Sequence, residues 1–332
     1  MNAPRATPDD DIAFLVATPC EGTATEMARC QPVRPDSPAH DSFTRLLNRL
    51  EPDAEALWRE VRPLLPKQGV LVFDDTVLDK PFARHMGLVG RHWSGRHKRV
   101  VQGINLVTAV WTDGDALWPC DYRLVDKPAG DGTKNDHLRQ MLDTAAGRGL
   151  VPSCVCFDCW YSGLDNLKAV RRHGWVFLTR VRSNRRVNPD RSGNRSVSDC
   201  TIASTGTVVH LEGFGLVKAF RIVATDGDTE HWITNDLGMG EATRLGFAER
   251  AWGIEEYHRG LKQHTAVDRC QTRMGKAQRN HIGFALRAFV RLEWHRFSTG
   301  VSWYAAKLGI IREAIRGFLA QPAFTLPDTA TA

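Results

Sequence analysis

The sequence predicts a mixed α/β protein in which a central sheet is flanked by helical segments from both ends of the chain. Three observations support this fold class. Residues 11–65 and 241–320 carry helical patterns, residues 69–126 hold three strand-like runs in succession, and residues 134–181 alternate between helix and strand. Successive strands with short links favour antiparallel pairing, whereas strands that alternate with helices favour parallel pairing. Both kinds of pairing are therefore expected in one sheet.

Residues 1–65 are expected to form a small helical domain. The apolar residues of "HDSFTRLLNRLE", 40–51, recur at helical spacing, so one face of this segment should pack against the core. The opposite face carries Arg45 and Arg49, whose side chains suit phosphates and base edges. Three short helices ending in such a face resemble a helix-turn-helix DNA-binding domain. Because ordinary surface helices share this pattern, both interpretations stay open.

Residues 66–182 supply the main strands of the sheet. "GVLVFDD", "VVQGINLVTAVWTD" and "ALWPCDYRLVD" are strand-like, and the last two are joined by the tight-turn signal "GD". A helix, a strand, a second helix and the strand "WVFLTRV" follow, which is the pattern of a β-α-β unit. The order β-β-β-α-β-α-β in one sheet is that of an RNase H-like fold, and this segment would form its first part.

The remaining chain is expected to interrupt and then complete this core. Residues 183–240 turn polar and strand-like and are interpreted as a β-rich insertion, whereas 241–325 are helical and would complete the core. Gly246, Gly253 and Gly260 recur every seven residues in the first of these helices. Such a stripe would let the helix approach another element closely.

The charge balance favours a polyanionic partner. The chain has 44 Lys and Arg residues against 38 Asp and Glu, a net charge of +6 and a pI near 9.0. Much of the excess lies in two runs, "RHWSGRHKR" at 91–99 and residues 171–186. Arg96 and Lys98 are the expected backbone contacts in the first run. A solvated basic face is the ordinary alternative for both runs.

The sequence shows no secretory or membrane signal. The amino terminus "MNAPRATPDDD" lacks the basic and apolar regions of a signal peptide, and no apolar run approaches the roughly 20 residues of a membrane span. A cytoplasmic protein without membrane contact is expected, with its eight cysteines reduced. Cys154, Cys156 and Cys159 could bind zinc, but their alternation with apolar residues favours small core side chains.

Acidic residues follow two of the predicted strands. Asp74 and Asp75 end "LVFDD", and because strand side chains alternate, only one of them can face the working side of the sheet. Asp158 ends "SCVCFD", at the carboxyl end of the expected neighbouring strand, where open sheets usually hold their ligands. Two such acids form a plausible metal site, which a carboxylate from a helix would complete.

The helix that contains "WGIEEYHRGLKQ", residues 252–263, is the expected source of this third carboxylate. Glu255 shares a helical face with His258, Arg259 and Lys262, whereas Glu256 does not. Cations beside a metal ligand suit phosphate binding, which favours Glu255. The ordinary alternative is a simple ion pair between Glu255 and Arg259, worth a few tenths of a kcal/mol.

Four ordered stretches resemble one family of enzymes. "VFDDTVLDKP", "GRHWSGRHKRVVQGINLV", "CFDCWYS" and "WGIEEYHRGLKQ" are similar to the motifs of DDE-type insertion-sequence transposases, in the IS-four-like superfamily and its seven-oh-one branch. The similarity covers most of the chain, from about residue 11 to residue 320. It implies an RNase H-like catalytic domain.

This resemblance implies particular roles for the motif residues. The aspartate of the family's D-x-T motif corresponds to Asp74, with Thr76 as its threonine, and the second aspartate corresponds to Asp158, before Trp160 and Tyr161. The family's glutamate has the spacing to lysine that Glu255 has to Lys262. Asp74, Asp158 and Glu255 would thus be the catalytic metal ligands.

One motif departs from the family pattern. Relatives place tyrosine-x2-arginine-x3 before the glutamate, whereas this chain has Phe247-x2-Arg250, and Ala251 stands where the arginine is expected. Arg250 therefore stands one position before the residue to which the family pattern assigns the DNA contact, a departure that bears on whether this copy is fully active. The three carboxylates are unaffected.

The resemblance also implies the chemistry and the partners. Two Mg²⁺ ions, which Mn²⁺ could replace, would support cleavage at element ends and joining of the 3′-hydroxyl to target DNA. The DNA partners would be terminal inverted repeats and target DNA, bound in part by His258, Arg259 and Lys262. Pairing of two ends implies a homodimer, and the setting is the bacterial cytoplasm, at the nucleoid when DNA is bound.

Two other functions stay open at this level. A catalytically silent DNA-binding regulator derived from a transposase would keep the fold but not the cleavage. A stand-alone RNase H-like nuclease would cut DNA without joining strands. Retention of all three carboxylates favours an enzyme over the silent regulator.

Overall fold

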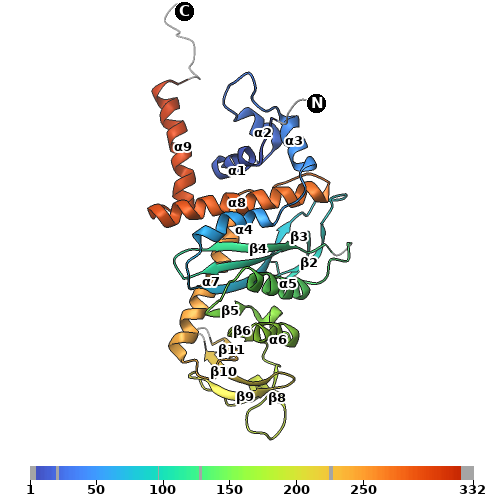
Figure 1. Cartoon of the computed structure of the whole chain (residues 1–332), viewed down its shortest axis with the longest axis vertical. Coiled ribbons are helices and arrows are strands. Elements are labelled where there is room, and N and C mark those ends of the chain that lie inside the picture. The colour runs from blue at the N-terminus through green and yellow to red at the C-terminus, as the bar shows by residue number, and fades with distance from the viewer. Residues whose placement is uncertain (1–4, 20–21, 96, 127–128, 224–226, 323–332) are drawn as a thin grey trace, which may run out of the picture.

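The computed structural model describes residues 5–19, 22–95, 97–126, 129–223 and 227–322 and shows an elongated molecule, with the N-terminal helices towards one end and β-rich strands at the other (Figure 1). Its first four helices are α1 (Pro8–Ala17), α2 (Ala24–Arg29), α3 (His40–Arg49) and α4 (Glu55–Val61). The apolar face of α3 is buried, as its spacing predicted. Residues 30–39 separate α2 from α3, which is longer than the three- to four-residue turn of a typical helix-turn-helix motif. A DNA-reading role for this region stays a prediction.

The predicted order of strands and helices is present in the central sheet. Its strands are β1 (Val70–Asp79), β2 (Gly90–Ser94), β3 (Arg99–Thr112), β4 (Trp118–Leu124), β5 (Cys154–Phe157) and β6 (Phe177–Val181). β1, β3 and β4 pair antiparallel in succession, while β5 pairs parallel with both β1 and β6. The mixed α/β prediction is confirmed.

Strand β2 is an element that sequence reasoning did not anticipate. It overlaps the basic run 91–99, for which no strand was predicted, and it pairs antiparallel with the start of β3. The run is short and mostly polar, so it gives no apolar alternation that would indicate a strand. The pairing comes from the length of β3, which extends past the residues paired with β4 and offers free edge positions at 99–103.

The β-rich segment continues the same sheet. Its strands are β7 (Arg186–Asn188), β8 (Arg195–Ser196), β9 (Thr207–Leu211), β10 (Gly215–Val223) and β11 (Thr229–Thr234). β11 pairs antiparallel with β6, so an eleven-stranded sheet runs through the described part of the chain. The predicted strands are therefore present, and they extend the core sheet from its β6 edge.

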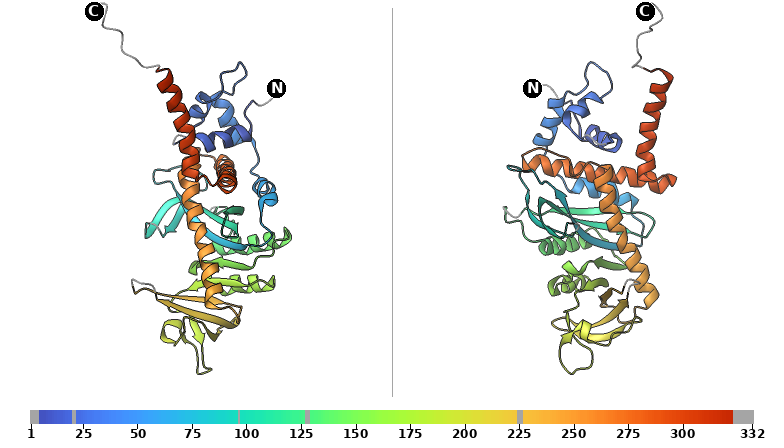
Figure 2. Two further views of the ribbon diagram at one scale, coloured as in Figure 1. Left: turned by 90° about the vertical axis from the view of Figure 1, so that its left-hand side faces the viewer. Right: turned by 180° about the vertical axis from the view of Figure 1, so that it is seen from behind.

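Helices cover both faces of the sheet. α5 (Lys134–Gly147) and α6 (Leu164–Arg172) lie on one face, and the long helix α7 (Glu241–His264) runs across the other (Figure 2). Two of the three glycines in the α7 stripe explain its close packing. A Cβ on Gly253 would lie 2.6 Å from Leu117, and one on Gly260 would overlap the Trp303 ring, whereas Gly246 has open space around it.

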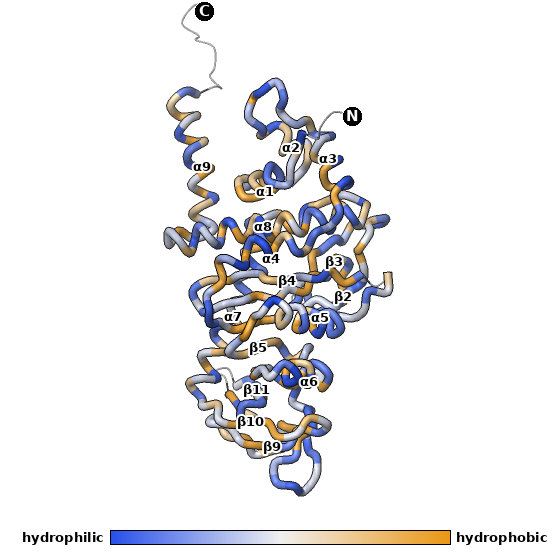
Figure 3. Tube along the Cα trace, in the orientation of Figure 1, coloured by the Kyte–Doolittle hydropathy of each residue, from blue (hydrophilic) through white to orange (hydrophobic). Residues whose placement is uncertain are grey.

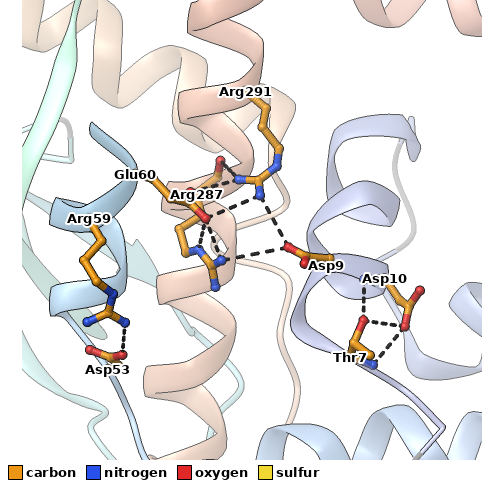
Figure 4. Close-up of polar contacts among 8 residues, drawn as sticks. All are labelled: Thr7, Asp9, Asp10, Asp53, Arg59, Glu60, Arg287 and Arg291. Atoms are coloured by element: carbon orange, nitrogen blue, oxygen red, sulfur yellow. Dashed lines mark hydrogen bonds and ion pairs between the residues drawn. The ribbon is translucent and has the colours of Figure 1, made fainter. Parts of the chain in front are cut away.

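Two further helices follow in the described part of the chain, α8 (Gly275–Thr299) and α9 (Trp303–Ala320). α8 lies between helices α1–α3 and the sheet, and α9 projects away from α8 with polar and apolar residues interspersed (Figures 1 and 3). Two arginines of α8 bind acids from the N-terminal region (Figure 4). Arg287 and Arg291 lie 2.6 and 3.0 Å from Glu60 of α4, and Arg291 lies 3.5 Å from Asp9 of α1. No helix in the described residues is long and apolar enough to cross a membrane.

Candidate active site

Asp74 and Asp158 lie side by side because of the register of two parallel strands. Phe73 of β1 is paired with Phe157 of β5, so the residue after each is an aspartate at the same level of the sheet. β5 ends at Phe157, as expected, but β1 continues to Asp79. The prediction that the first strand ends at the acids was therefore wrong, because every residue of β1 from Val70 to Asp79 is paired with β3.

Asp75 lines the same cavity as Asp74 and Asp158, so the prediction that only one of the two consecutive aspartates faces the working side was wrong. Its Oδ1 accepts a hydrogen bond from the Tyr161 hydroxyl at 2.7 Å. Its Oδ2 accepts hydrogen bonds from Asn105 and from the Lys134 ammonium, both at 2.6 Å. Both oxygens of this carboxylate are thus used within the protein fold. Asp75 therefore stabilises the junction of β1, β3 and α5 at the wall of the cavity.

Helix α7 adds Glu255 to the same cavity. A cavity of about 1070 Å³ is lined by Asp74, Asp158 and Glu255, which come from β1, the end of β5 and α7. Other lining residues from the sequence prediction are Thr76, Trp160, His258, Arg259 and Lys262. Side chains that are far apart in sequence, such as Asp74 and Glu255, thus meet in one place. We name this the active-site cavity.

Glu256 lines a different cavity. This second cavity, of about 640 Å³, lies on the other side of α7 and includes Glu256, Arg250, Trp252 and Arg296. Within the described residues, neither Glu255 nor Glu256 forms an ion pair with Arg259. The ion-pair alternatives for these glutamates are therefore not realised in the structure.

The pKa of Asp74 is raised by its burial and by the acids that lie near it. Burial raises the pKa of Asp74 well above its usual value, and the negative charges of Asp75, Asp158 and Glu255 add to this. Burial also raises the pKa of Asp158, although the Trp160 N–H, which donates to its Oδ1 at 2.9 Å, opposes the shift. Such a group of acids is electrostatically suited to a cation.

The donor set fits a hard divalent metal ion. Mg²⁺ and Mn²⁺ prefer carboxylate oxygens and keep several water ligands, so they tolerate an open cavity. Among the residues that the structure describes, no three His, Cys, Asp or Glu side chains already surround one point at metal-binding distances. Asp74, Asp158 and Glu255 line a shared cavity, but their oxygens would have to move closer together to bind one ion.

His258 is buried beside Asp74. Its Nδ1 lies 3.6 Å from Oδ2 of Asp74, and the side chain is almost fully buried. Burial, with the charge of Lys262, lowers the pKa of His258 to about 3, so the ring is neutral near pH 7. The expectation that His258 binds DNA directly does not suit this burial, because little of the ring reaches the surface.

The two cations of the same helix differ in their surroundings. The Lys262 ammonium donates a hydrogen bond to the backbone carbonyl of Val77 at 2.9 Å and so links α7 to β1. Arg259 is exposed and lines the active-site cavity. Both are positioned within the cavity that holds the three carboxylates.

Aromatic and basic side chains form one wall of the cavity. Trp160 is 46 % exposed, and the Lys134 ammonium and the Arg182 guanidinium lie 5.2 and 6.0 Å from its ring centroid. Tyr161 is fully buried and serves Asp75. Sequence reasoning missed Lys134 as a site residue. The only available signal was its position at the start of a helix that follows a loop.

Three other residues named from the sequence, Lys98, Arg45 and Arg49, do not line the active-site cavity. Arg96 is outside the described residues, and Lys98 is exposed in the turn between β2 and β3. Arg45 pairs with Asp41 on α3, while Arg49 donates to the Ala6 carbonyl at 2.7 Å. None of these contacts tests a DNA-binding role, which stays a prediction.

Two sequence features are clarified by their surroundings. Arg250 lines the second cavity and not the active-site cavity, so the departure from the family motif does not touch the carboxylates. Cys154 and Cys156 are buried in β5 with their sulfur atoms 3.8 Å apart. They pack in the core, in agreement with the interpretation that was favoured over zinc.

Comparisons with known proteins agree with this geometry. The family profile described as "DDE superfamily endonuclease" matches residues 25–196. Among curated proteins, no relative was found by sequence. The structure of the piggyBac transposase in a synaptic complex with hairpin DNA is similar over 100 % of this chain and 80 % of that chain, at 12 % identity and a TM-score of 0.51. The likeness is one of fold.

A second solved structure is only distantly similar. The Drosophila P element transposase strand transfer complex aligns over 97 % of this chain and 88 % of that chain, at 9 % identity. Its TM-score of 0.31 is too low to support an argument. The family match, by contrast, spans more than half of the 332 residues. The chain therefore belongs to the DDE superfamily of endonucleases.

Proposed function

We propose that this DDE endonuclease is a DNA transposase that cuts the ends of its element and joins the resulting 3′-hydroxyl to target DNA. The observation that carries this proposal is the meeting of Asp74, Asp158 and Glu255 in one cavity, from β1, the end of β5 and α7. The similarity of fold to a transposase supports it. Strand joining itself rests on that analogy.

The three carboxylates would hold two Mg²⁺ ions, for which Mn²⁺ is a substitute. When bound by these carboxylates, such ions would supply charge stabilisation for the attacking and leaving oxygens of phosphoryl transfer. Asp74 and Asp158 are fixed by adjacent strands, while Glu255 approaches from a helix across the cavity. Neutral His258 packs against Asp74 and would fix the orientation of its carboxylate.

Basic side chains in the cavity would hold the DNA backbone. Arg259 is exposed toward solvent and suits a bidentate contact with a phosphate. Lys262 is hydrogen-bonded to β1 and would add positive charge beside the same phosphate.

Trp160, with Lys134 and Arg182 near its ring, would stack on a base close to the cleavage point. Thr76 lies on the same side of β1 as Asp74 and would support it.

Farther contacts would set binding to the terminal inverted repeats. Lys98 extends the basic surface from the β2–β3 turn, and Arg45 and Arg49 would contribute from α3. A homodimer would bring two element ends together. The expected setting is the bacterial cytoplasm, at the nucleoid when the protein is bound to DNA.

The test uses a plasmid that carries the genomic DNA flanking both sides of the gene, where inverted repeats are expected. Wild-type protein should nick it at the repeat ends with Mg²⁺ or Mn²⁺ and not with EDTA. Asp74→Asn, Asp158→Asn and Glu255→Gln should each remove nicking, and Glu256→Gln is the matched control because this residue faces the second cavity. Unchanged nicking in the first three variants would exclude the assignment.

Pre-cleaved ends separate the alternatives. A transposase joins their 3′-hydroxyls to a second DNA molecule, which gives a larger product on a denaturing gel. A stand-alone nuclease cuts but gives no joined product. Repeat binding without any cleavage, under conditions where Mg²⁺ raises the melting temperature, would identify a silent regulator.

A further inference from the structure

A third cavity adjoins the active-site cavity where β1 ends. It has a volume of about 650 Å³ and shares Asp79, the last residue of β1, with the active-site cavity. Residues 79–86 form one side, and residues of the 268–273 loop after α7 form the other. A strand of DNA held over the three carboxylates could therefore continue directly into this cavity.

Phe82 is the unusual residue of this cavity. Its side chain is 94 % exposed, although phenylalanine is among the most buried residue types. A single exposed apolar residue is common on protein surfaces and would mean little by itself. Phe82, however, lines a cavity beside the active site together with several charged residues.

The turn that carries Phe82 is firmly anchored. The Lys80 ammonium donates hydrogen bonds to the carbonyls of Asp268 and Cys270, at 2.7 and 2.5 Å. The Lys80 N–H donates to the Gln102 carbonyl at 2.9 Å, and the Gln102 amide donates to the Ala83 carbonyl. The ring is thus presented on a fixed backbone. Such preorganisation lowers the entropy lost when a ligand binds.

Several basic residues line the same cavity as the exposed ring. Arg84, Arg269 and Arg273 are exposed and line the cavity, together with His85. The two acids of the lining have partners: Asp79 lies 3.0 Å from His97, and Asp268 lies 3.7 Å from Arg269. A cationic surface with an aromatic ring at its centre is the usual design for binding single-stranded nucleic acid, because phosphates meet cations and a base stacks on the ring.

We propose that this third cavity, the Phe82 cavity, binds the unpaired DNA strand that flanks the cleavage point, with Phe82 stacked on a base. Arg84 and Arg273 contact backbone phosphates on either side of that base. The strand is unpaired because the ring can stack only on a base whose face is open. This inference rests on the proposed function, since it extends the path of the same DNA.

The experiment measures DNA binding by the full-length protein in EDTA, where no cleavage occurs. The probes are a fluorescein-labelled single strand of about 16 nucleotides, the upper end of the site size of one single-strand-binding module, and the duplex of the same sequence. Phe82→Ala should weaken binding of the single strand at least about fivefold, because stacking on one aromatic ring is worth about 1–3 kcal/mol per base. Binding of the duplex should change less than about twofold, and Phe82→Trp should keep wild-type affinity for both.

Tyr304→Ala is the matched control. Tyr304 is an aromatic residue of α9 that is 66 % exposed and lines the second cavity, so its removal should leave both affinities unchanged. Arg84→Gln and Arg273→Gln should each reduce the slope of log K against log salt by about 0.7 for the single strand. Equal single-strand affinity in Phe82→Ala and wild type, or an equal loss for the duplex, would overturn the inference.

The two proposals fail in different ways. If wild-type protein nicks the plasmid and Phe82→Ala binds the single strand normally, the Phe82 cavity has no such role and the transposase assignment stands. If wild-type protein binds the single strand through Phe82 but Asp74→Asn still nicks the plasmid, the assignment of the catalytic residues fails instead.

Discussion

Glu255 and Glu256 are consecutive residues of α7, yet their side chains line two different cavities. Successive residues of an α-helix are rotated by about 100° around its axis, so neighbours in sequence face different directions. Glu255 is on the side that faces β1 and β5, and Glu256 is on the side that faces Arg296 of α8. The geometry thus separates two acids that are chemically alike.

This separation predicts opposite outcomes for two conservative variants. Glu255→Gln should lower metal-dependent cleavage by about 10³-fold or more, because metal-assisted charge stabilisation is worth several kcal/mol. Glu256→Gln should stay within about threefold of wild type, since it touches no group of the active-site cavity. Initial rates of plasmid nicking at saturating Mg²⁺ measure both, and a loss of similar size in the two variants would contradict the assignment of Glu255.

Asp74→Asn should separate stability from metal binding. In EDTA the variant should melt roughly 2–4 °C above wild type, because removing the charge relieves the cost of burying it and the repulsion from Asp75, Asp158 and Glu255. Addition of Mg²⁺ should raise the melting temperature of wild type, since a ligand that binds the folded state stabilises it, and should raise that of Asp74→Asn much less. An identical Mg²⁺ shift in both proteins would exclude Asp74 as a ligand.

Asp75→Asn provides the contrast at the neighbouring carboxylate, whose oxygens are already used in hydrogen bonds within the fold. Asp75 accepts hydrogen bonds from Tyr161, Asn105 and Lys134, and an amide cannot replace both carboxylate oxygens. The variant should be destabilised by about 1–3 kcal/mol, measured by urea unfolding. Its Mg²⁺ shift should resemble that of wild type.

Arg259→Gln should weaken DNA binding in a salt-dependent way. One lost phosphate contact reduces the slope of log K against log salt by about 0.9 for duplex DNA. Arg312→Gln, an exposed arginine on the projecting α9, is the control and should leave the slope unchanged. Fluorescence anisotropy over a range of salt concentrations gives both slopes, and equal slopes for all three proteins would remove Arg259 from the DNA contact surface.

The glycines of α7 predict a stability difference within one helix. Gly260→Ala should destabilise the fold by about 1–3 kcal/mol, because the added Cβ would overlap the Trp303 ring and lie 3.1 Å from Phe289. Gly246→Ala meets no atom within 4 Å and should stabilise the helix by up to about 1 kcal/mol. Thermal melts should therefore shift in opposite directions, and a shift of the same sign would contradict the close packing of α7 against α9.

Asp11 predicts a pH dependence in the N-terminal helices. Burial, with the charge of Asp10, raises the pKa of Asp11 to about 7 from an ordinary value of 3.8. Because the pKa of Asp11 is higher in the folded state than in the unfolded state, the protonated side chain favours folding. This contribution to stability is present below about pH 4 and is lost as the pH rises through 7. Asp11→Asn should therefore melt higher than wild type at about pH 8 and similarly at about pH 4. A pH-independent difference would contradict the shift.

Local patterns predicted most of the fold. The apolar spacing of α3, the long helix α7 and the alternation of strands and helices from β1 to β6 are all signals within short windows, and each is present in the structure. β2 escaped prediction because its pairing depends on the length of β3, which is a relation between distant segments. The position of the acids inside β1, and not at its end, has the same cause.

The sequence by itself determined the candidate residues, since Asp74, Asp158, Glu255, Arg259 and Lys262 follow from strand alternation, helical spacing and family motifs. Only the tertiary structure decided which of their neighbours share the active-site cavity. It buried His258 against Asp74 and engaged both oxygens of Asp75 in hydrogen bonds within the fold. It also directed Glu256 to the second cavity and placed Phe82 in a cavity next to the active-site cavity. These outcomes depend on burial and on contacts between segments far apart in the chain, and no local pattern encodes either of them.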